Sequence, residues 1–276
     1  MGLLSKLFFW KRRNAVVPVV RLNGIISASN SLGRRGLSLE SIEPQLKKAF
    51  SIKRANAVAL LINSPGGSPV QSSLIGHRIR DLARQSDKPV LAFCEDVAAS
   101  GGYWIAAAAD EIIADPASVV GSIGVVSAGF GFDKVINRLG IDRRVYTAGE
   151  SKMTLDPFQP EKVEEVARLK SLQNDIHQQF ITHIENRRGS RLKGTRLDLF
   201  SGAFWTGQRA IELGLVDSLG EYRRTIFDRF GEDTKILLIE PKRKLFSLGF
   251  PSLSGQIIDD AAAAAIERAH YRRFGL

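Results

Sequence analysis

The chain has 276 residues, of which 44% are hydrophobic and 25% are charged, a balance ordinary for a globular protein with a large buried core. Cys94 is the single cysteine, which excludes an intramolecular disulfide and predicts a small core residue at that position. The net charge of +10 favours anionic partners, but no zinc-finger or RRM-like signature accompanies it, so we expect a solvated basic surface and no nucleic-acid partner.

Residues 1–14 read as a short basic amphipathic segment. Their apolar stretch is far shorter than the roughly 20 residues that span a bilayer. Lys11, Arg12 and Arg13 follow this stretch, whereas the charges of a cleavable secretory signal precede its apolar core. Two interpretations stay open: an interfacial anchor on an anionic membrane surface, or a terminus that is frayed or packed on a neighbouring subunit.

Strands and helices are expected to alternate through the first half of the chain. The apolar runs at 57–63 and 89–94 predict strands buried on both faces, and the β-branched run at 15–26 predicts another. Helices are predicted over residues 38–50, 70–84, 101–109 and 132–139, and further strands over 110–114, 121–126 and 143–148. This alternation indicates an α/β fold.

The second half begins with a long charged amphipathic helix over 161–187, which Gly189 ends. Residues 205–220 predict a short helix, a glycine stop and the start of a strand, and residues 235–240 predict a last strand. Because no internal repeat or linker is evident, we expect a single domain over 15–240, preceded by the 1–14 segment and followed by a basic tail over 241–276.

Small residues predominate in two predicted strand-to-helix turns. One is S-P-G-G-S at 64–68, and the other surrounds Ser100 in A-A-S-G-G-Y-W. Each is explained by a plain turn, and the first is not a P-loop because it lacks G-K-[ST]. If the two turns lie side by side at one end of a parallel sheet, however, the Ser100 hydroxyl faces bare backbone N–H groups, as a nucleophile beside an oxyanion hole does.

A nucleophilic serine needs a base, and two residue types compete for that role. The histidines (His77, His177, His183 and His270) are not in glycine-rich or loop settings, so a Ser–His–Asp triad is not supported, and together with Cys94 they lack metal-ligand spacing. Lys152, in A-G-E-S-K-M-T-L-D-P-F, is by composition alone a surface loop lysine. A lysine acts as a base only if its environment lowers its pKa from about 10.4.

Five blocks in order give the chain a resemblance to a known family from about Pro18 to about Glu240. The blocks are N-S-P-G-G, A-S-G-G-Y-W, G-S-I-G-V, A-G-E-S-K-M-T-L-D-P-F and W-T-G-Q-R-A-I-E-L-G-L-V-D-S-L-G. They resemble the signal peptide peptidase A family of serine peptidases (S49, protease IV-like), in its short single-unit form. The resemblance implies a crotonase/ClpP-like α/β fold of repeated ββα units with helical C-terminal elements, and a homo-oligomeric ring.

The resemblance also implies a Ser/Lys dyad that needs neither cofactor nor metal. Carried over residue by residue, Ser100 matches the nucleophile, Lys152 the general base, and Ser122 the serine that orients the lysine amine. Gly67 and Gly101 match the oxyanion donors. The expected activity is therefore that of a serine endopeptidase acting on peptides or unfolded proteins.

Small apolar residues around Ser100 suit signal peptides or other small, apolar peptide segments. Since no transmembrane span or cleavable signal is evident, we expect a cytoplasmic protein or one peripheral on the inner membrane. Two alternatives remain open: a catalytically inactive, membrane-associated scaffold of the same fold, and another Clp/crotonase-fold acyl-transfer enzyme. The missing base histidine argues against a Clp-type peptidase, and a crotonase needs no serine nucleophile.

Overall fold

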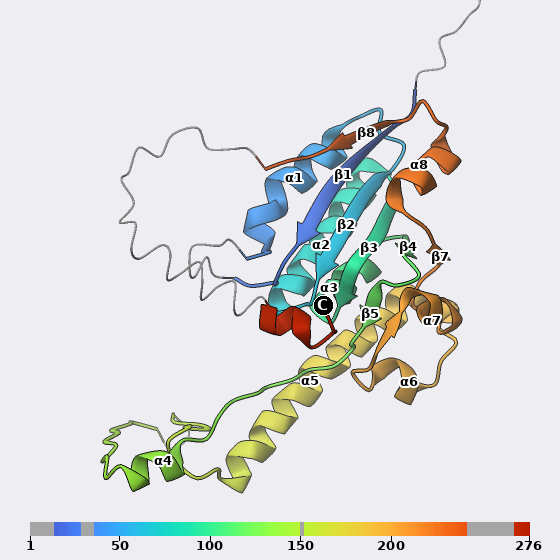
Figure 1. Ribbon diagram of the computed structural model, residues 1–276. Helices are drawn as coiled ribbons and strands as arrows, with labels where there is room; N and C mark the ends of the chain where they lie inside the picture. The colour runs from blue at the N-terminus through green and yellow to red at the C-terminus, as the bar shows by residue number, and fades with distance from the viewer. Residues whose placement is uncertain (1–13, 29–35, 150–151, 242–267) are drawn as a thin grey trace, which may run out of the picture.

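A single eight-stranded sheet organises the protein, as the computed structural model shows for residues 14–28, 36–149, 152–241 and 268–276 (Figure 1). Its order is β6-β5-β3-β2-β1-β8, with β4 paired to β3 and β7 paired to β4. The strands are β1 (Val16–Asn23), β2 (Val58–Ser64), β3 (Val90–Ala99), β4 (Glu111–Ala114), β5 (Val119–Gly121), β6 (Phe204–Thr206), β7 (Ser218–Leu219) and β8 (Lys235–Leu238). Every pairing is parallel except that of β5 with β6, which confirms the predicted α/β fold.

Helices cover both faces of this sheet. They are α1 (Leu39–Ser51), α2 (Pro69–Ser86), α3 (Gly101–Ala107), α4 (Asp133–Arg138), α5 (Val163–Arg188), α6 (Arg196–Phe200), α7 (Gly207–Glu212) and α8 (Tyr222–Phe230), with a short 3₁₀ turn at Gly189–Arg191. Leu60 belongs to the cluster that includes apolar residues of α1, α2 and α3, whereas Leu61 joins Ile226 of α8. Alternate residues of the central strands are thus buried on opposite faces, which explains their continuous apolar runs.

The predicted helices are confirmed, and two strands differ from the sequence-based expectation. The strand expected over 121–126 instead spans Val119–Gly121, in β5. The prediction of a strand over 143–148 is wrong, because these residues adopt no regular secondary structure. They lie away from the sheet, where no neighbouring strand can pair with them, and β-propensity without a partner does not make a strand.

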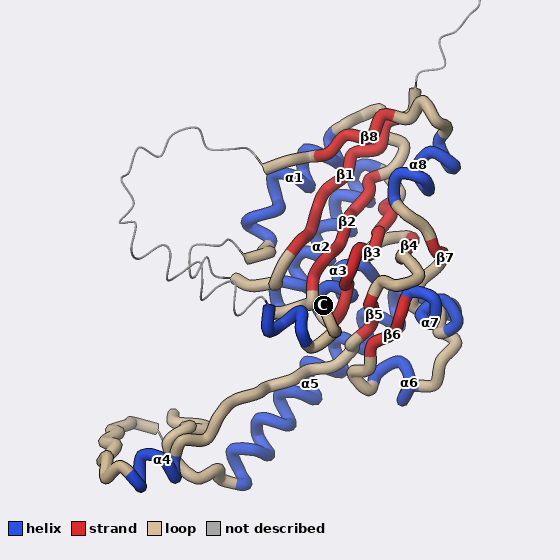
Figure 2. The backbone as a smooth tube through the Cα atoms, viewed as in Figure 1, coloured by secondary structure: helices blue, strands red, loops and turns tan. Residues whose placement is uncertain are grey.

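An arm leaves the sheet after β5 (Figure 2). We use this name for residues 126–149 and 152–170, which comprise α4, its flanking segments and the first turns of α5. Large apolar side chains of the arm face solvent, among them Val126, Phe130, Leu139, Tyr146 and Val163. The arm therefore has no core of its own comparable to that of the sheet.

The chain returns to the sheet at residues 268–276. Residues 268–272 form a short helix, and the Tyr271 hydroxyl donates to the Asn63 carbonyl at 3.0 Å. Phe274 is buried against Val97 and Ala99 of β3. The expectations for residues 1–13 and 242–267, which hold the amphipathic segment and much of the tail, fall outside the described residues.

Two smaller expectations concern the core and the membrane. Cys94 is buried as predicted, and burial raises the pKa of its thiol to about 12. Among the helices in the described ranges, none combines the length and the apolar character that crossing a bilayer requires.

Candidate active site

Ser100 occupies the tight turn between β3, which ends at Ala99, and α3, which begins at Gly101. Its backbone has φ 53° and ψ −123°, a left-handed conformation that costs a non-glycine residue free energy. Although serine is a favoured helix N-cap, the Ser100 hydroxyl makes no capping hydrogen bond. Strain of this kind concentrates at functional sites, where it directs a side chain away from its ordinary partners.

The two small-residue turns lie side by side, as the parallel pairing of β2 with β3 requires. A Cβ atom at Gly66, where φ is +101°, would lie 2.7 Å from the Cβ of Ser100 and 2.8 Å from the Gly101 nitrogen. A Cβ at Gly67 would lie 2.1 Å from the Ile26 carbonyl oxygen. Only glycines therefore allow this loop to approach the serine so closely.

This approach brings together two backbone N–H groups. A Cβ placed on Gly101 would be 3.4 Å from the Gly67 nitrogen, so the two amides are neighbours. Within the described part of the chain, neither N–H donates a hydrogen bond to a protein acceptor. Free N–H groups beside a serine hydroxyl can bind the oxyanion of a tetrahedral intermediate.

Ser122 stands beside this pair at the end of β5. The backbone N–H of Ser100 donates to the Gly121 carbonyl at 2.8 Å, and the Ser122 N–H donates to the Ala203 carbonyl at 2.7 Å. Ser122 is 3% exposed and also has a left-handed backbone, with φ 52°. Its Oγ accepts a hydrogen bond of 3.4 Å from Nη2 of Arg273.

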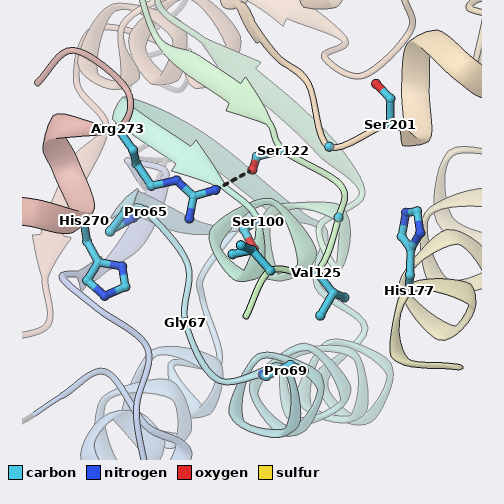
Figure 3. Close-up of a pocket in the computed structure, with 13 residues that line it drawn as sticks. Pro65, Gly67, Pro69, Ser100, Ser122, Val125, His177, Ser201, His270 and Arg273 are labelled. Carbon is cyan, nitrogen blue, oxygen red and sulfur yellow. Dashed lines mark hydrogen bonds between the residues drawn. The ribbon is translucent and has the colours of Figure 1, made fainter. Parts of the chain in front are cut away.

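A cavity of about 530 Å³ connects these groups, and its wall includes Gly67, Ser100 and Ser122. Figure 3 shows Arg273 and His270 on one side of Ser100 and His177 on the other. Sequence reasoning set His177 and His270 aside as bases and did not single out Arg273. His177 is on α5, where only the packing of that helix against the turn reveals its place, and the other two come from the basic tail.

The histidines do not form a triad with Ser100. His177 Nε2 donates to the Ile123 carbonyl at 3.0 Å, and Val125 lies between this imidazole and Ser100 in Figure 3. His183 stacks on Trp104 with ring centroids 4.9 Å apart and donates to the Trp104 carbonyl. Burial lowers the pKa of His183 to about 4, which suits a neutral core-edge residue.

The structure does not bring Lys152 to Ser100 within one copy of the chain. Lys152 is exposed on the arm and is not part of the cavity wall. Its loop is held at the end of the arm, where Arg143 pairs with Asp156 at 2.9 Å and the Leu155 N–H donates to Glu165 at 2.7 Å. Figure 1 shows the segment between α4 and α5 far from the sheet that carries the serine turn.

Comparison with known proteins identifies the family. The sequence profile of peptidase family S49 matches residues 82–232, which is more than half of the chain. The chain belongs to peptidase family S49. The S49 match includes Ser100, Ser122 and Lys152, and it places the chain among relatives of serine peptidases.

Individual relatives differ in sequence identity, in the share of each chain that aligns, and in name. The chain is 28% identical over 226 residues to a putative signal peptide peptidase SppA of Enterococcus faecium, covering 81% of this chain and 65% of the relative. It is 51% identical over 290 residues to a Brucella abortus protein named Na(+)/H(+) antiporter NhaA. That alignment covers 100% of this chain but 39% of the Brucella protein, so the chain spans about two fifths of that longer relative.

A solved structure of a mutant of the 1510-N membrane-bound stomatin-specific protease is also similar. It is 15% identical with a TM-score of 0.49, and the match covers 83% of this chain and 99% of that one.

Proposed function

We propose that this chain is a serine endopeptidase in which Ser100 is the nucleophile. The observation that carries the proposal is the turn at Ser100: a strained serine whose hydroxyl lines a cavity beside the unpaired N–H groups of Gly67 and Gly101. Membership in the S49 family supports it independently.

In the proposed reaction, the neutral amine of Lys152 accepts the Ser100 proton while Oγ forms a bond to the peptide carbonyl carbon. The N–H groups of Gly67 and Gly101 bind the resulting oxyanion. The carbon–nitrogen bond then breaks, and the ammonium of Lys152 returns the proton to the leaving amine. A water molecule hydrolyses the acyl-enzyme by the same route and frees Ser100.

Lys152 is proposed to come from a neighbouring copy in a homo-oligomeric ring. Two features of the arm support this: Lys152 is exposed at its end, and large apolar side chains such as Phe130 (81% exposed) and Val163 (80% exposed) face solvent along it. An exposed apolar surface of this extent indicates a protein interface. The hydroxyl of Ser122 is proposed to hold the incoming amine.

The proposed substrates are signal peptides or other small, apolar segments of peptides and unfolded proteins. Small residues at the turn, Ala99 and Gly101 among them, leave room beside Ser100, and the Enterococcus relative is named a putative signal peptide peptidase. We further propose that the protein is cytoplasmic or peripheral on the inner membrane. Its basic surface favours an anionic membrane.

Mixing two inactive variants tests the shared site. Ser100→Ala and Lys152→Ala are each expected to lose casein hydrolysis, whereas their mixture, after dissociation and reassembly, should recover about one quarter of the wild-type rate, because random assembly places both intact residues at one site in four. If no activity returns, the dyad is not shared between copies. If Lys152→Ala stays active and His177→Ala does not, His177 is the base.

Labelling separates the enzyme from its alternatives. A fluorophosphonate should modify wild-type protein at Ser100 and leave Ser100→Ala unmodified. Absence of label and of hydrolysis in the assembled wild type would favour the inactive scaffold. Label without peptide hydrolysis would favour another acyl-transfer reaction on the same fold.

A further inference from the structure

Residues 268–276 contribute His270 and Arg273 to the cavity wall, and this segment packs on the sheet. The Tyr271 hydroxyl donates to the Asn63 carbonyl, and Phe274 is 7% exposed in a cluster with Val97 and Ala99. The ring of Phe204 meets that of Phe274 edge-on at 5.1 Å. These contacts on both sides of Arg273 fix the position of its backbone.

The guanidinium of Arg273 is held toward the cavity. It lies over the Phe274 ring at 4.9 Å and donates one hydrogen bond to Ser122 (Figure 3). In the described part of the chain no carboxylate pairs with it, in contrast to the buried Arg188, which pairs with Asp217 at 2.7 Å. A guanidinium has five N–H donors, so the edge that does not contact Ser122 remains available to a ligand.

The guanidinium of Arg273 gives the cavity wall its positive charge. Arg273, His177 and His270 line it, and no aspartate or glutamate is among the described residues that do so. A concave site that holds an arginine and no carboxylate attracts anions, and a planar guanidinium prefers a carboxylate, which it can bind through two parallel hydrogen bonds. The wall therefore favours a carboxylate next to Ser100.

We propose that Arg273 is a specificity-determining residue that binds a carboxylate of the substrate peptide close to the scissile bond. This inference rests on the peptidase function proposed above and adds a substrate class to it. The carboxylate has two sources in a peptide: the side chain of an aspartate or glutamate, or the α-carboxylate at its C-terminus. Both present the same two oxygens to the guanidinium.

Binding to Ser100→Ala protein tests the inference without requiring hydrolysis. Fluorescein-labelled casein-derived peptides are prepared with glutamate or glutamine at each position, and with a C-terminal acid or amide, and their binding is followed by fluorescence anisotropy. Peptides that keep the bound carboxylate should bind roughly 10- to 100-fold more tightly than their neutral counterparts. The position at which neutralisation weakens binding distinguishes a side chain from the α-carboxylate.

Two second-site variants in the Ser100→Ala background make the result specific. Arg273→Gln should abolish the preference for the carboxylate, whereas Arg272→Gln, the same change at an exposed neighbouring residue, should preserve it. A thermal melt of each variant confirms that residues 268–276 still pack on the sheet, since losing the buried Phe274 would lower Tm.

Three outcomes would overturn the inference. The first is equal binding of acidic and neutral peptides, and the second is an equal loss of preference in both arginine variants, which would indicate general attraction to a basic protein. The third is tighter binding of every peptide by Arg273→Gln, which would show that Arg273 blocks the cavity. Failure of the peptidase function is recognised separately, because the assembled wild type then hydrolyses no casein, whether or not fluorophosphonate labels Ser100.

Discussion

A backbone hydrogen bond ties Ser100 to the residue before Ser122, and both serines have a positive φ. The Ser100 N–H donates to the carbonyl of Gly121, the residue before Ser122, and the two serines have φ values of 53° and 52°. Among the described residues, only Asp87 and Leu155 are further non-glycine residues with positive φ. Apart from Asp87, which caps the end of α2, the strained residues are thus concentrated at the cavity and in the loop that carries Lys152.

The strain at Ser100 predicts a difference between two variants that both remove its hydroxyl. Ser100→Gly should be about 1–2 kcal/mol more stable than Ser100→Ala, because only glycine adopts this conformation without a Cβ penalty. Urea denaturation of both variants measures the difference. Equal stabilities would mean that the turn relaxes to an ordinary conformation once the hydroxyl is absent.

Gly66 is expected to tolerate no side chain. Gly66→Ala should lower the rate of fluorophosphonate labelling at least about tenfold, because its Cβ displaces Ser100 or the Gly101 N–H from the oxyanion site. Gly76→Ala is the matched control: its Cβ meets Trp104 at an ordinary 3.5 Å, and alanine within α2 should add up to about 1 kcal/mol of stability. Unchanged labelling of Gly66→Ala would show that the two turns can separate without loss of the site.

The arm predicts an assembly that depends on its apolar side chains. Phe130→Ser should reduce the oligomeric mass measured by sedimentation and lower peptide hydrolysis, because it removes apolar surface from the proposed interface. Leu197→Ser changes a residue of similar exposure, 78% against 81%, on α6 outside the arm, and should leave both unchanged. An assembly unaffected by the first change would exclude that part of the arm from the interface.

Arg188 is expected to be a major determinant of stability. It is 3% exposed, donates to the Gly214 carbonyl at 2.8 Å, and pairs with Asp217, so its loss leaves a partly buried carboxylate without its main partner. Arg188→Ala should cost about 3–5 kcal/mol in the free energy of unfolding. Arg196→Ala, which breaks an exposed pair with Glu185, should cost less than about 1 kcal/mol, and comparable losses would contradict this view of the two pairs.

The burial of His183 is expected to make the protein less stable in mild acid. Its pKa is about 4 in the folded protein, below the ordinary value of 6.5, so the neutral form is favoured by folding. Stability from this group is fully present above pH 6.5 and is lost as the pH falls toward 4, by up to about 3 kcal/mol. The variant His183→Phe keeps a ring on Trp104 but has no group that titrates there. Between pH 6.5 and 4, the unfolding free energy of the wild type should therefore fall more than that of His183→Phe. Parallel plots of the two free energies against pH would contradict this role of His183.

The serine turn could be predicted because its determinants are contiguous. An apolar strand, small residues around Ser100 and a glycine pair specify a strand-to-helix turn within a few positions, and the parallel sheet then places the Gly66–Gly67 turn beside it. The long helix could be predicted to end at Gly189 for the same local reason, and Gly189 is its C-cap. The roles of these residues in catalysis stay predictions.

The arm and the basic cavity wall could not be predicted, because both depend on long-range contacts. Residues 143–148 have the composition of a strand, but whether a strand forms is decided by what lies beside them. Arg273 belongs to a basic tail that composition alone describes as solvated, and only the burial of Phe274 reveals that this segment reaches the cavity.

The separation of Lys152 from the cavity of its own copy has a consequence for control. Under the proposed division of the dyad, a newly synthesised chain carries a nucleophile with no base beside it. Its activity then rises with protein concentration, because each site is completed only when another chain arrives, and dilution reverses the process. Such a peptidase is silent as a lone chain, which protects other nascent polypeptides from it until a full assembly has formed.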